Sequence, residues 1–199
     1  MTDTLQSINT IGAMSSSEPE KPSDPLQAEY EEGKRYFENN EYGQAAVALH
    51  NALVGFKEKN DEAGIANASN QLGNVCFARK EYESALKHYQ QALAICESSN
   101  DRMSILAVMK KMVEVYGELK QYDQAIEKYL VILDHYQDNR DPQGTVTTLE
   151  GMAEIYVKND KKEKAADTYR TIASIHSNFG HKTIAGGFMK KAEQLTADT

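Results

Sequence analysis

The sequence contains no tryptophan, two cysteines and four prolines among its 199 residues. No apolar run approaches the roughly 18–20 residues that a membrane-spanning helix needs, and no basic segment followed by an apolar core marks a secretory signal at the N-terminus. We therefore expect a cytoplasmic protein that does not insert into a membrane. Cys76 and Cys96 stand apart from clustered histidines, which favours small core residues over a disulfide or a zinc site.

Positive charge is also scarce. The chain carries 22 Lys and Arg against 30 Asp and Glu, a formal net charge of −8 at pH 7. A nucleic-acid-binding surface needs a basic face to contact phosphates, and an anionic membrane surface attracts the same kind of face. The charge balance therefore argues against both kinds of partner.

Patterns that would suggest catalysis or a cofactor are missing as well. Metal-ligand spacing is absent among the five histidines, His50, His88, His135, His176 and His181. Gly186-Gly187 stands alone and does not form a glycine-rich phosphate loop. None of the many carboxylates is paired with an apolar pocket that would raise its pKa for acid–base work. We predict a chain that is not an enzyme and has no cofactor and no metal.

What the sequence does contain is one pattern that recurs every 40 residues. A small residue recurs as Ala45, Ala85, Ala125 and Ala165. Nine of the eleven tyrosines fall into three further columns: Tyr42, Tyr82 and Tyr122; Tyr89, Tyr129 and Tyr169; and Tyr36, Tyr116 and Tyr156. A repeat of about 20–50 residues is typical of a solenoid, in which each unit buries its apolar face against its neighbours.

Each unit is predicted to contain two helices. In the second unit, intervals of three and four residues place one stripe of a helix at Tyr82, Ala85, Leu86, Tyr89, Ala92, Leu93 and Cys96. Alternating strand patterns are absent and helix formers dominate the sequence. We predict an all-α fold, a right-handed α-solenoid of helix-turn-helix repeats with nine helices in total.

The repeats are predicted to span residues 26–60, 61–100, 101–140 and 141–180, followed by a capping helix at 181–197. In the first unit, helices 26–39 and 42–58 meet at Asn39-Asn40, because Asn tolerates the left-handed backbone conformation. Caps for the first helices of the later units are predicted at Asn60-Asp61, Asn100-Asp101 and Asp141-Pro142. The capping helix is predicted to bury one face against the last repeat, at Ile184, Phe188, Ala192 and Leu195.

Residues 1–25 are predicted to form a disordered tail. This segment contains SSSEPEKPSDP, whose Ser, Pro and Glu cannot bury enough surface to offset the entropy of ordering. Leu5, Ile8 and Ile11 recur every third residue, so a short docking helix is the alternative, although a helix of this length is marginal on its own.

The repeated columns resemble the tetratricopeptide repeat. Its first helix carries Leu-Gly and then an aromatic residue, and the corresponding residues here are Leu72-Gly73 with Cys76, and Gly33 with Tyr36. Its second helix carries a small residue, an aromatic and another small residue, which correspond to Ala85, Tyr89 and Ala92. The sequence departs from the family by lacking the turn glycine, by placing Met112-Val113 and Met152-Ala153 where Leu-Gly is expected, and by repeating every 40 residues rather than about 34.

This longer unit resembles the repeats of spindle-orientation adaptors, kinesin light chains and bacterial peptide-sensing regulators. The resemblance implies a concave groove, lined by the first helices, that binds an extended peptide segment of another protein. We therefore expect a non-catalytic adaptor or scaffold for protein–protein interaction. The alternative is a structural self-assembly module that forms homo-oligomers through its repeats, suggested by exposed apolar content at Phe188 and Met189 of the last helix.

Three asparagines in the second unit are the leading candidates for ligand contacts. Asn67, Asn70 and Asn74 lie at i, i+3 and i+7, on the helix face opposite the predicted apolar stripe. Asn is a poor helix former, so three on one face call for an explanation. An Asn amide both donates and accepts hydrogen bonds, so it can pair with the backbone of any peptide. An ordinary solvated face is the alternative.

Equivalent positions in the other units add Tyr30, Lys34, Lys110, Glu114, Glu150 and Glu154 to the predicted groove. Phe37 and Phe77 occupy one column and are predicted either to form apolar pockets in the groove or to fill the core of each hairpin. One end of this groove would be mixed basic and amide and the other acidic. This polarity predicts a ligand with an acidic portion near Lys34, Asn74 and Lys110, and a basic portion near Glu150 and Glu154. A carboxylate clamp for chaperone C-termini would be incomplete, because the first unit lacks the expected Lys and Asn.

Overall fold

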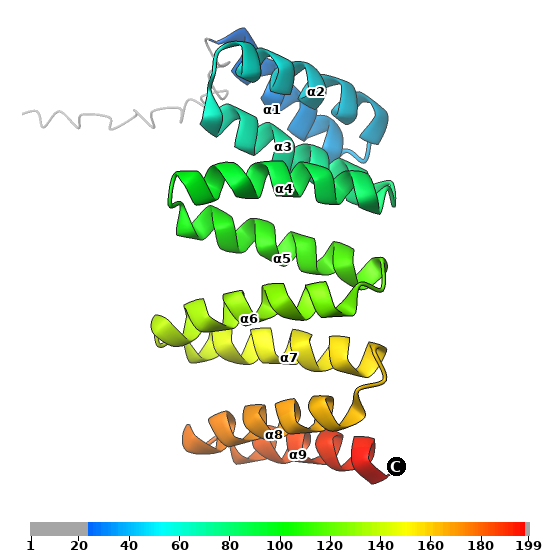
Figure 1. Ribbon diagram of the computed structural model, residues 1–199, viewed down its shortest axis with the longest axis vertical. Helices are drawn as coiled ribbons and strands as arrows, with labels where there is room; N and C mark the ends of the chain where they lie inside the picture. Colours follow the sequence, from blue (N-terminus) through cyan, green and yellow to red (C-terminus); the bar gives the residue numbers. More distant parts are fainter. Residues whose placement is uncertain (1–23, 198–199) are drawn as a thin grey trace, which may run out of the picture.

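The computed structural model describes residues 24–197, which form nine α-helices joined by short turns (Figure 1). They are α1 Pro25–Glu38, α2 Tyr42–Glu58, α3 Glu62–Ala78, α4 Tyr82–Ser98, α5 Arg102–Glu118, α6 Tyr122–Asp138, α7 Pro142–Lys158, α8 Lys162–Asn178 and α9 Lys182–Ala197. The helices stack one after another from α1 to α9, and no strand occurs between residues 24 and 197. The predicted all-α solenoid is therefore confirmed. The predicted tail, with Leu5, Ile8 and Ile11, lies outside the described residues except for Asp24 and Pro25.

Every turn between helices places one residue in the left-handed region of the backbone. The φ values run from 52° to 78° at Asn40, Asn60, Lys80, Asn100, Lys120, Arg140, Asp160 and Gly180. At the first turn the N–H of Glu41 donates to the carbonyl of Tyr36 at 2.8 Å, so the chain reverses while the last carbonyls of α1 stay bonded. The predicted turn role of Asn40 is confirmed, and the same turn recurs with Lys, Arg and Asp in its place.

Aspartates cap four of the first helices. The Asp24 carboxylate accepts from the N–H of Leu26 at 3.0 Å, and α1 accordingly begins at Pro25, one residue before the predicted start. The predicted caps are confirmed: Asp61 accepts from Gly64 at 2.9 Å, Asp101 from Ser104 at 3.2 Å and Asp141 from Gly144 at 2.9 Å. Each such cap stabilises its helix by about 1 kcal/mol, so the caps define where each unit begins.

The repeated small residue lies at the centre of each unit. Ala45, Ala85, Ala125 and Ala165 are all 0% exposed. Gly73 allows a second close approach, because a Cβ there would lie 2.5 Å from the Tyr89 ring. The third unit has Val113 at the equivalent position, and its tyrosine, Tyr129, instead lies against Gly151 of the next unit, where a Cβ would overlap the phenol oxygen. Because the third unit lacks the Leu-Gly pair, its tyrosine packs against the next unit and not within its own hairpin.

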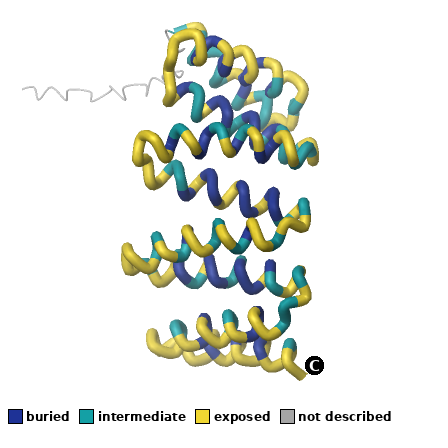
Figure 2. The backbone as a smooth tube through the Cα atoms, in the orientation of Figure 1, coloured by how far each residue is buried: buried dark blue, intermediate teal, exposed yellow. Residues whose placement is uncertain are grey.

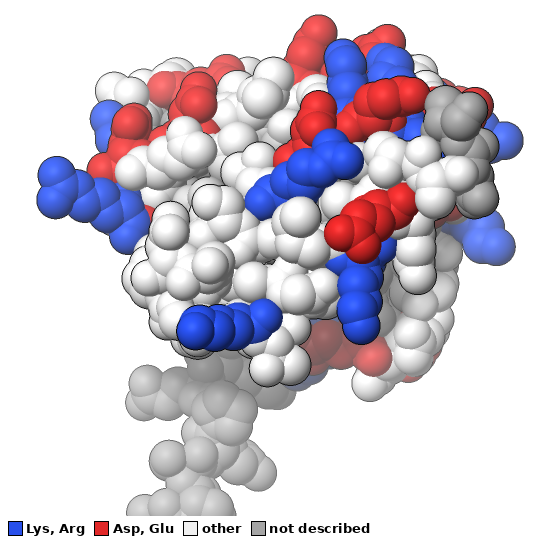
Figure 3. All heavy atoms as spheres, turned by 90° about the horizontal axis from the view of Figure 1, so that it is seen from below, with Lys and Arg blue, Asp and Glu red and all other residues white. Residues whose placement is uncertain are grey.

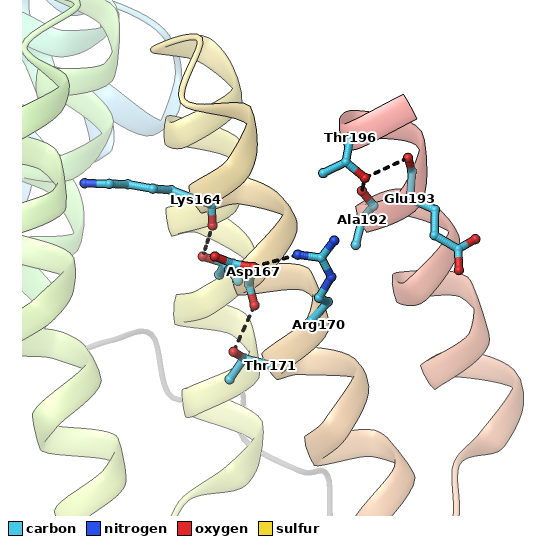
Figure 4. Close-up of polar contacts among 8 residues, drawn as sticks. Lys164, Asp167, Arg170, Thr171, Ala192, Glu193 and Thr196 are labelled. Carbon is cyan, nitrogen blue, oxygen red and sulfur yellow. Dashed lines mark hydrogen bonds and ion pairs between the residues drawn. The ribbon is translucent and has the colours of Figure 1, made fainter. Parts of the chain in front are cut away.

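The last helix packs on α8 through small residues and one ring. Ala185, Phe188 and Ala192 are buried, and Figure 2 shows buried segments within both α8 and α9. The Phe188 ring stacks on the rings of Tyr169 and His176. The polar contacts in Figure 4 all join residues within α8 or within α9. The contacts between the two helices are this apolar packing and the approach of Lys191 Nζ to within 5.4 Å of the Tyr169 ring centre.

Phe188 and Ala192 are buried, as the predicted stripe required, but Ile184 is 49% exposed and Ala185 takes its place in the stripe. Leu195 is half-buried. The separate expectation that Phe188 gives this helix exposed apolar surface was wrong, because the residue is only 8% exposed.

Candidate functional site

Three pockets adjoin one another along the stack, and each is lined by residues of at least one first helix. The N-terminal pocket, about 250 Å³, lies among Phe77 of α3, α5, Tyr129 and α7. The central pocket, about 430 Å³, lies among α5, α6 and α7, and the C-terminal pocket, about 550 Å³, among α7, α8 and α9. Glu114 lines the first two pockets, and Gln143 and Thr147 line the last two. The three pockets therefore lie next to one another along the stack, and together we call them the groove.

The N-terminal pocket is rich in carboxylates. Glu114, Glu118 and Glu154 line it, with Lys158 as the one basic side chain among its lining residues. Glu118 accepts a hydrogen bond from the Tyr82 hydroxyl at 3.2 Å. The pocket thus presents a negative surface that favours a cationic group.

The central pocket contains a lysine held by a tyrosine. Lys110 Nζ donates to the Tyr136 hydroxyl at 2.7 Å and lies 5.2 Å from the centre of the same ring. Glu114, on the next turn of α5, pairs with Lys111 at 3.0 Å. Lys110 is therefore the cation available to a ligand in the middle of the groove.

The C-terminal pocket is mostly apolar. Its lining residues are Pro142, Gln143, Val146, Thr147, Glu150, Ile175, His176, Phe179, His181, Ile184 and Phe188. Among them Glu150 is the only carboxylate and there is no Lys or Arg. His176 and His181, which the sequence analysis regarded as scattered, lie together with their Nδ1 atoms 3.4 Å apart.

The pKa values of two half-buried tyrosines, Tyr129 in the groove and Tyr169 on α8, are affected by acidic side chains that line the groove. Burial raises the pKa of Tyr129, and the negative charges of Glu154 and Glu114 raise it further. Burial likewise raises the pKa of Tyr169, helped by Glu154 and Glu150. These three glutamates therefore act on the same region although they come from two helices.

Five of the predicted site residues line the groove: Phe77, Lys110, Glu114, Glu150 and Glu154. Phe77 also packs its ring 5.7 Å from that of Tyr82, and Phe37 packs 5.8 Å from Tyr42. Both phenylalanines lie against the hydrophobic core, as the second of the two interpretations expected. Phe77 thus serves the hairpin core and the groove wall at once.

The predicted asparagine face is not part of the three pockets. Asn74 Oδ1 accepts from the Tyr89 hydroxyl at 2.8 Å, and its Nδ2 donates to Gln71 at 2.9 Å. Asn70 is half-buried, and its Oδ1 is buried without a hydrogen-bond partner. Asn67 is exposed. The three amides therefore have three different environments, and Asn74 has a structural contact that the helical spacing did not predict.

Tyr30 and Lys34 lie at the N-terminal end of the stack, in α1. Lys34 pairs with Glu31 at 2.8 Å, and this hydrogen bond raises the pKa of its ammonium group. The Tyr30 ring packs 6.4 Å from that of Phe56, and burial raises the pKa of its hydroxyl. The two residues also contact each other, with Lys34 Nζ 5.4 Å from the Tyr30 ring centre. Neither residue lines the groove defined above.

The sequence analysis missed most of the C-terminal pocket. Phe179, His181 and Ile184 come from the turn after α8 and the first residues of α9. A signal was present: this turn reads Phe179-Gly180-His181, where the earlier units have polar residues followed by a capping Asp. The break in the repeat coincides with the pocket.

Some kinds of site are not formed by residues 24–197. No group of three or more His, Cys, Asp or Glu side chains comes together there to hold a metal ion. None of these helices is long and apolar enough to cross a membrane. Cys76 and Cys96 are both free, and burial raises the pKa of each thiol. The groove is the feature that remains as a candidate site.

Comparison with known protein families agrees with the arrangement of the helices in pairs. Residues 64–138, from α3 to the end of α6, match the family model described as tetratricopeptide repeat. Residues 64–138 therefore carry tetratricopeptide repeats. Helices α2, α4, α6 and α8 begin 40 residues apart, so the helix pairs recur at a longer interval than the usual tetratricopeptide unit of about 34 residues. No curated protein matches the chain by sequence.

Solved structures share the same fold at low sequence identity. The tetratricopeptide-like repeats of a putative kinesin light chain from Podosopora anserina superpose with a TM-score of 0.72 at 15% identity, covering 87% of each chain. The apo form of RapI gives a TM-score of 0.67 at 18% identity, covering 92% of this chain and 69% of RapI. The sensor-bearing signal-transduction ATPase PH0952 from Pyrococcus horikoshii gives 0.72 at 16% identity, over 89% of this chain and 30% of that protein. At these identities the likeness establishes the fold.

Proposed function

We propose that this chain is a non-catalytic adaptor that binds an extended segment of another protein in the groove. The observation that carries the proposal is that the three pockets adjoin one another, since the first two share Glu114 and the last two share Gln143 and Thr147. An extended chain sends alternate side chains to the same face about 7 Å apart, so one segment can fill neighbouring pockets in turn. As the sequence predicts, we assign the adaptor to the cytoplasm.

The charges along the groove suggest the polarity of the bound segment. Basic residues of the partner would lie near Glu154 and Glu150, and an acidic or hydrogen-bond-accepting group near Lys110. The earlier assignment of the acidic portion to Lys34 and Asn74 is not supported in the same way, because neither residue lines the groove. Complementary charge of this kind adds mainly to specificity and to the rate of association.

A selection from a displayed library of random peptides tests the proposal. The full-length purified chain serves as bait, and the enriched peptides are then measured individually by fluorescence anisotropy. Thr147→Arg places a large charged side chain where the central and C-terminal pockets meet. We expect this variant to bind the selected peptides with at least tenfold lower affinity.

Thr171→Arg provides the matched control. Thr171 is exposed on α8 and lines none of the three pockets, so the same substitution there should leave peptide affinity unchanged. Thermal unfolding of both variants checks that the fold is intact. A selection without enriched peptides, or peptides that bind the Thr147→Arg variant as tightly as the original chain, would refute the groove as the site.

Self-assembly is the second candidate function, and one observation favours it. Helix α9 packs extensively only against α8 within residues 24–197, whereas the helices between α1 and α9 have neighbours on both sides. Met189 on α9 is 40% exposed. Phe188 no longer supports this alternative, because it is buried between α8 and α9. The oligomeric state in solution decides this question.

A further inference from the structure

The last turn of the solenoid breaks the pattern of the earlier ones. The corresponding triplets after α2, α4 and α6 are Lys59-Asn60-Asp61, Ser99-Asn100-Asp101 and Asn139-Arg140-Asp141. After α8 the triplet is Phe179-Gly180-His181. His181 has no carboxylate to accept the bonds that the capping aspartates accept, and Phe179 leaves an aromatic ring 59% exposed. Gly180, with φ of 78°, suits the left-handed position of the turn, so the departure lies in Phe179 and His181 on either side of it.

A second break lies one turn further on. Gly64 and Gly144 lie at the start of α3 and α7, where a Cβ would overlap the rings of Phe56 and Tyr136. In those units the ring at the end of the second helix therefore packs directly on the backbone of the next helix. The equivalent pair in the last unit is His176 and Ile184.

Because Ile184 replaces glycine, the ring of its unit packs elsewhere. The imidazole of His176 stacks on Phe188, with ring centres 5.7 Å apart and planes 4° apart. Ile184 stays 49% exposed and lines the C-terminal pocket together with the displaced imidazole. The last unit therefore differs from the earlier ones at positions 179, 181 and 184, and all three residues line the C-terminal pocket.

The charge of this pocket is also changed relative to the preceding unit. Glu150 stands one repeat after Lys110, the lysine of the central pocket. It is the only charged carboxylate among side chains that are otherwise apolar, aromatic or uncharged polar, and no lining Lys or Arg neutralises it. A ligand that fits must therefore combine an apolar body with a positive charge.

We propose that the C-terminal pocket binds an aromatic or branched apolar side chain of the partner segment, with a neighbouring Lys or Arg of that segment against Glu150. This inference rests on the proposed groove function and adds the side-chain chemistry that the groove selects. Phe179 and Ile184 supply apolar contact area, and Glu150 supplies the attraction for the cation.

Two small probes that share a phenylethyl group and carry opposite charges test the pocket without knowledge of the partner. 2-Phenylethylamine and 3-phenylpropanoate are titrated separately into the full-length ¹⁵N-labelled chain, and amide shifts give site and affinity. We expect both probes to shift amides in α7, the 179–181 turn and α9, with the amine bound about two- to fivefold more tightly, as a partly exposed ion pair allows.

Variants separate the two parts of the proposal. Glu150→Gln should remove the preference for the amine. Phe179→Ala should lower the affinity for both probes severalfold without unfolding the chain, because the Phe179 ring is largely exposed. Glu193→Gln changes an exposed carboxylate of α9 outside the pocket and should change neither affinity. Equal affinity of the two probes for the original chain, or shifts that avoid the pocket, would overturn the inference.

The peptide selection shows whether the pocket assignment alone is wrong or whether the proposed peptide binding in the groove is wrong as well. The selected peptides should carry Lys or Arg next to an aromatic or branched residue, and the Glu150→Lys variant should select peptides without that basic residue. If peptides bind in the groove and Thr147→Arg blocks them, but this pair is not enriched, the groove stands and the pocket assignment is wrong. If no peptide is selected, both proposals fail.

Discussion

At the scale of single residues, the hydrogen bond between Tyr89 and Asn74 determines what the asparagine face can do. Tyr89 is fully buried, and its hydroxyl donates to Asn74 Oδ1 at 2.8 Å. The other half of the Asn74 amide is occupied by Gln71. The Asn74 amide keeps one N–H and one lone pair, but it cannot turn toward a ligand without breaking the contact that holds α3 to α4. Exposed Asn67 is under no such constraint.

This arrangement predicts a stability effect of Asn74. Tyr89→Phe should lower the free energy of unfolding by about 1 kcal/mol, since it breaks one partly buried hydrogen bond, and Asn74→Ala by about 1–2 kcal/mol, since it also removes the bond to Gln71. The double variant should cost less than the sum of the single ones by about 0.5–1.5 kcal/mol, because the bond between Tyr89 and Asn74 can be lost only once. Urea unfolding of the three variants measures this coupling.

Asn67→Ala is the control for the same experiment. Because Asn67 is exposed, its replacement should change stability by less than about 0.5 kcal/mol. Additive costs at Asn74 and Tyr89 would mean that the bond contributes nothing to stability. In that case the Asn74 amide would again be available to a ligand.

At the scale of helices, the fit between glycines and rings sets how closely neighbours approach. Gly73 receives the Tyr89 ring within its own hairpin, while Gly151 receives Tyr129 from the preceding unit. Val113 fills the place that Gly73 leaves open, so the tyrosine of the third unit must turn toward the next one. The same column of the repeat thus packs in two ways.

The close contact at Gly73 predicts that even one added methyl group is harmful. Gly73→Ala should destabilise the chain by about 1–2 kcal/mol, because overpacking against the buried Tyr89 ring outweighs the better helix propensity of Ala. Gly186→Ala, in the interior of α9 with nothing within 4 Å of the added Cβ, should instead stabilise it by up to about 1 kcal/mol. Thermal and urea unfolding compare the two, and a stabilising Gly73→Ala would contradict this account.

The first and last residues of the helices could be predicted from the sequence with small error, but the residues that line the pockets could not. Periodic apolar residues and capping aspartates are local signals, so α2 runs from Tyr42 to Glu58 as predicted. The C-terminal pocket is assembled from α7, α8, the 179–181 turn and α9, and no local pattern describes that combination. Ile184 illustrates the limit: helical spacing placed it on the buried stripe, but the contact with α8 is made by Ala185.

At the scale of the whole molecule, each helix packs mainly on its neighbours in sequence, and the stack of described helices ends at α9. Figure 3 looks onto this end, where uncharged residues cover much of the surface and are interrupted by basic and acidic side chains. Deleting α9 is not a clean test of self-assembly. Its Phe188 and Ala192 are buried in packing on α8, so the deletion would uncover Ile172 and create a new apolar surface.

Point substitution on the outer part of α9 gives the clean test. We expect the full-length chain to be a monomer at high concentration, because Lys182, Lys190 and Lys191 are exposed on the same helix as Met189 and would repel a second copy. Light scattering measures the mass of the chain and of its Met189→Lys variant, and we expect the two masses to be equal. A dimer that this substitution dissociates, with unfolding temperature unchanged, would establish self-assembly through α9 and favour the second candidate function over the groove.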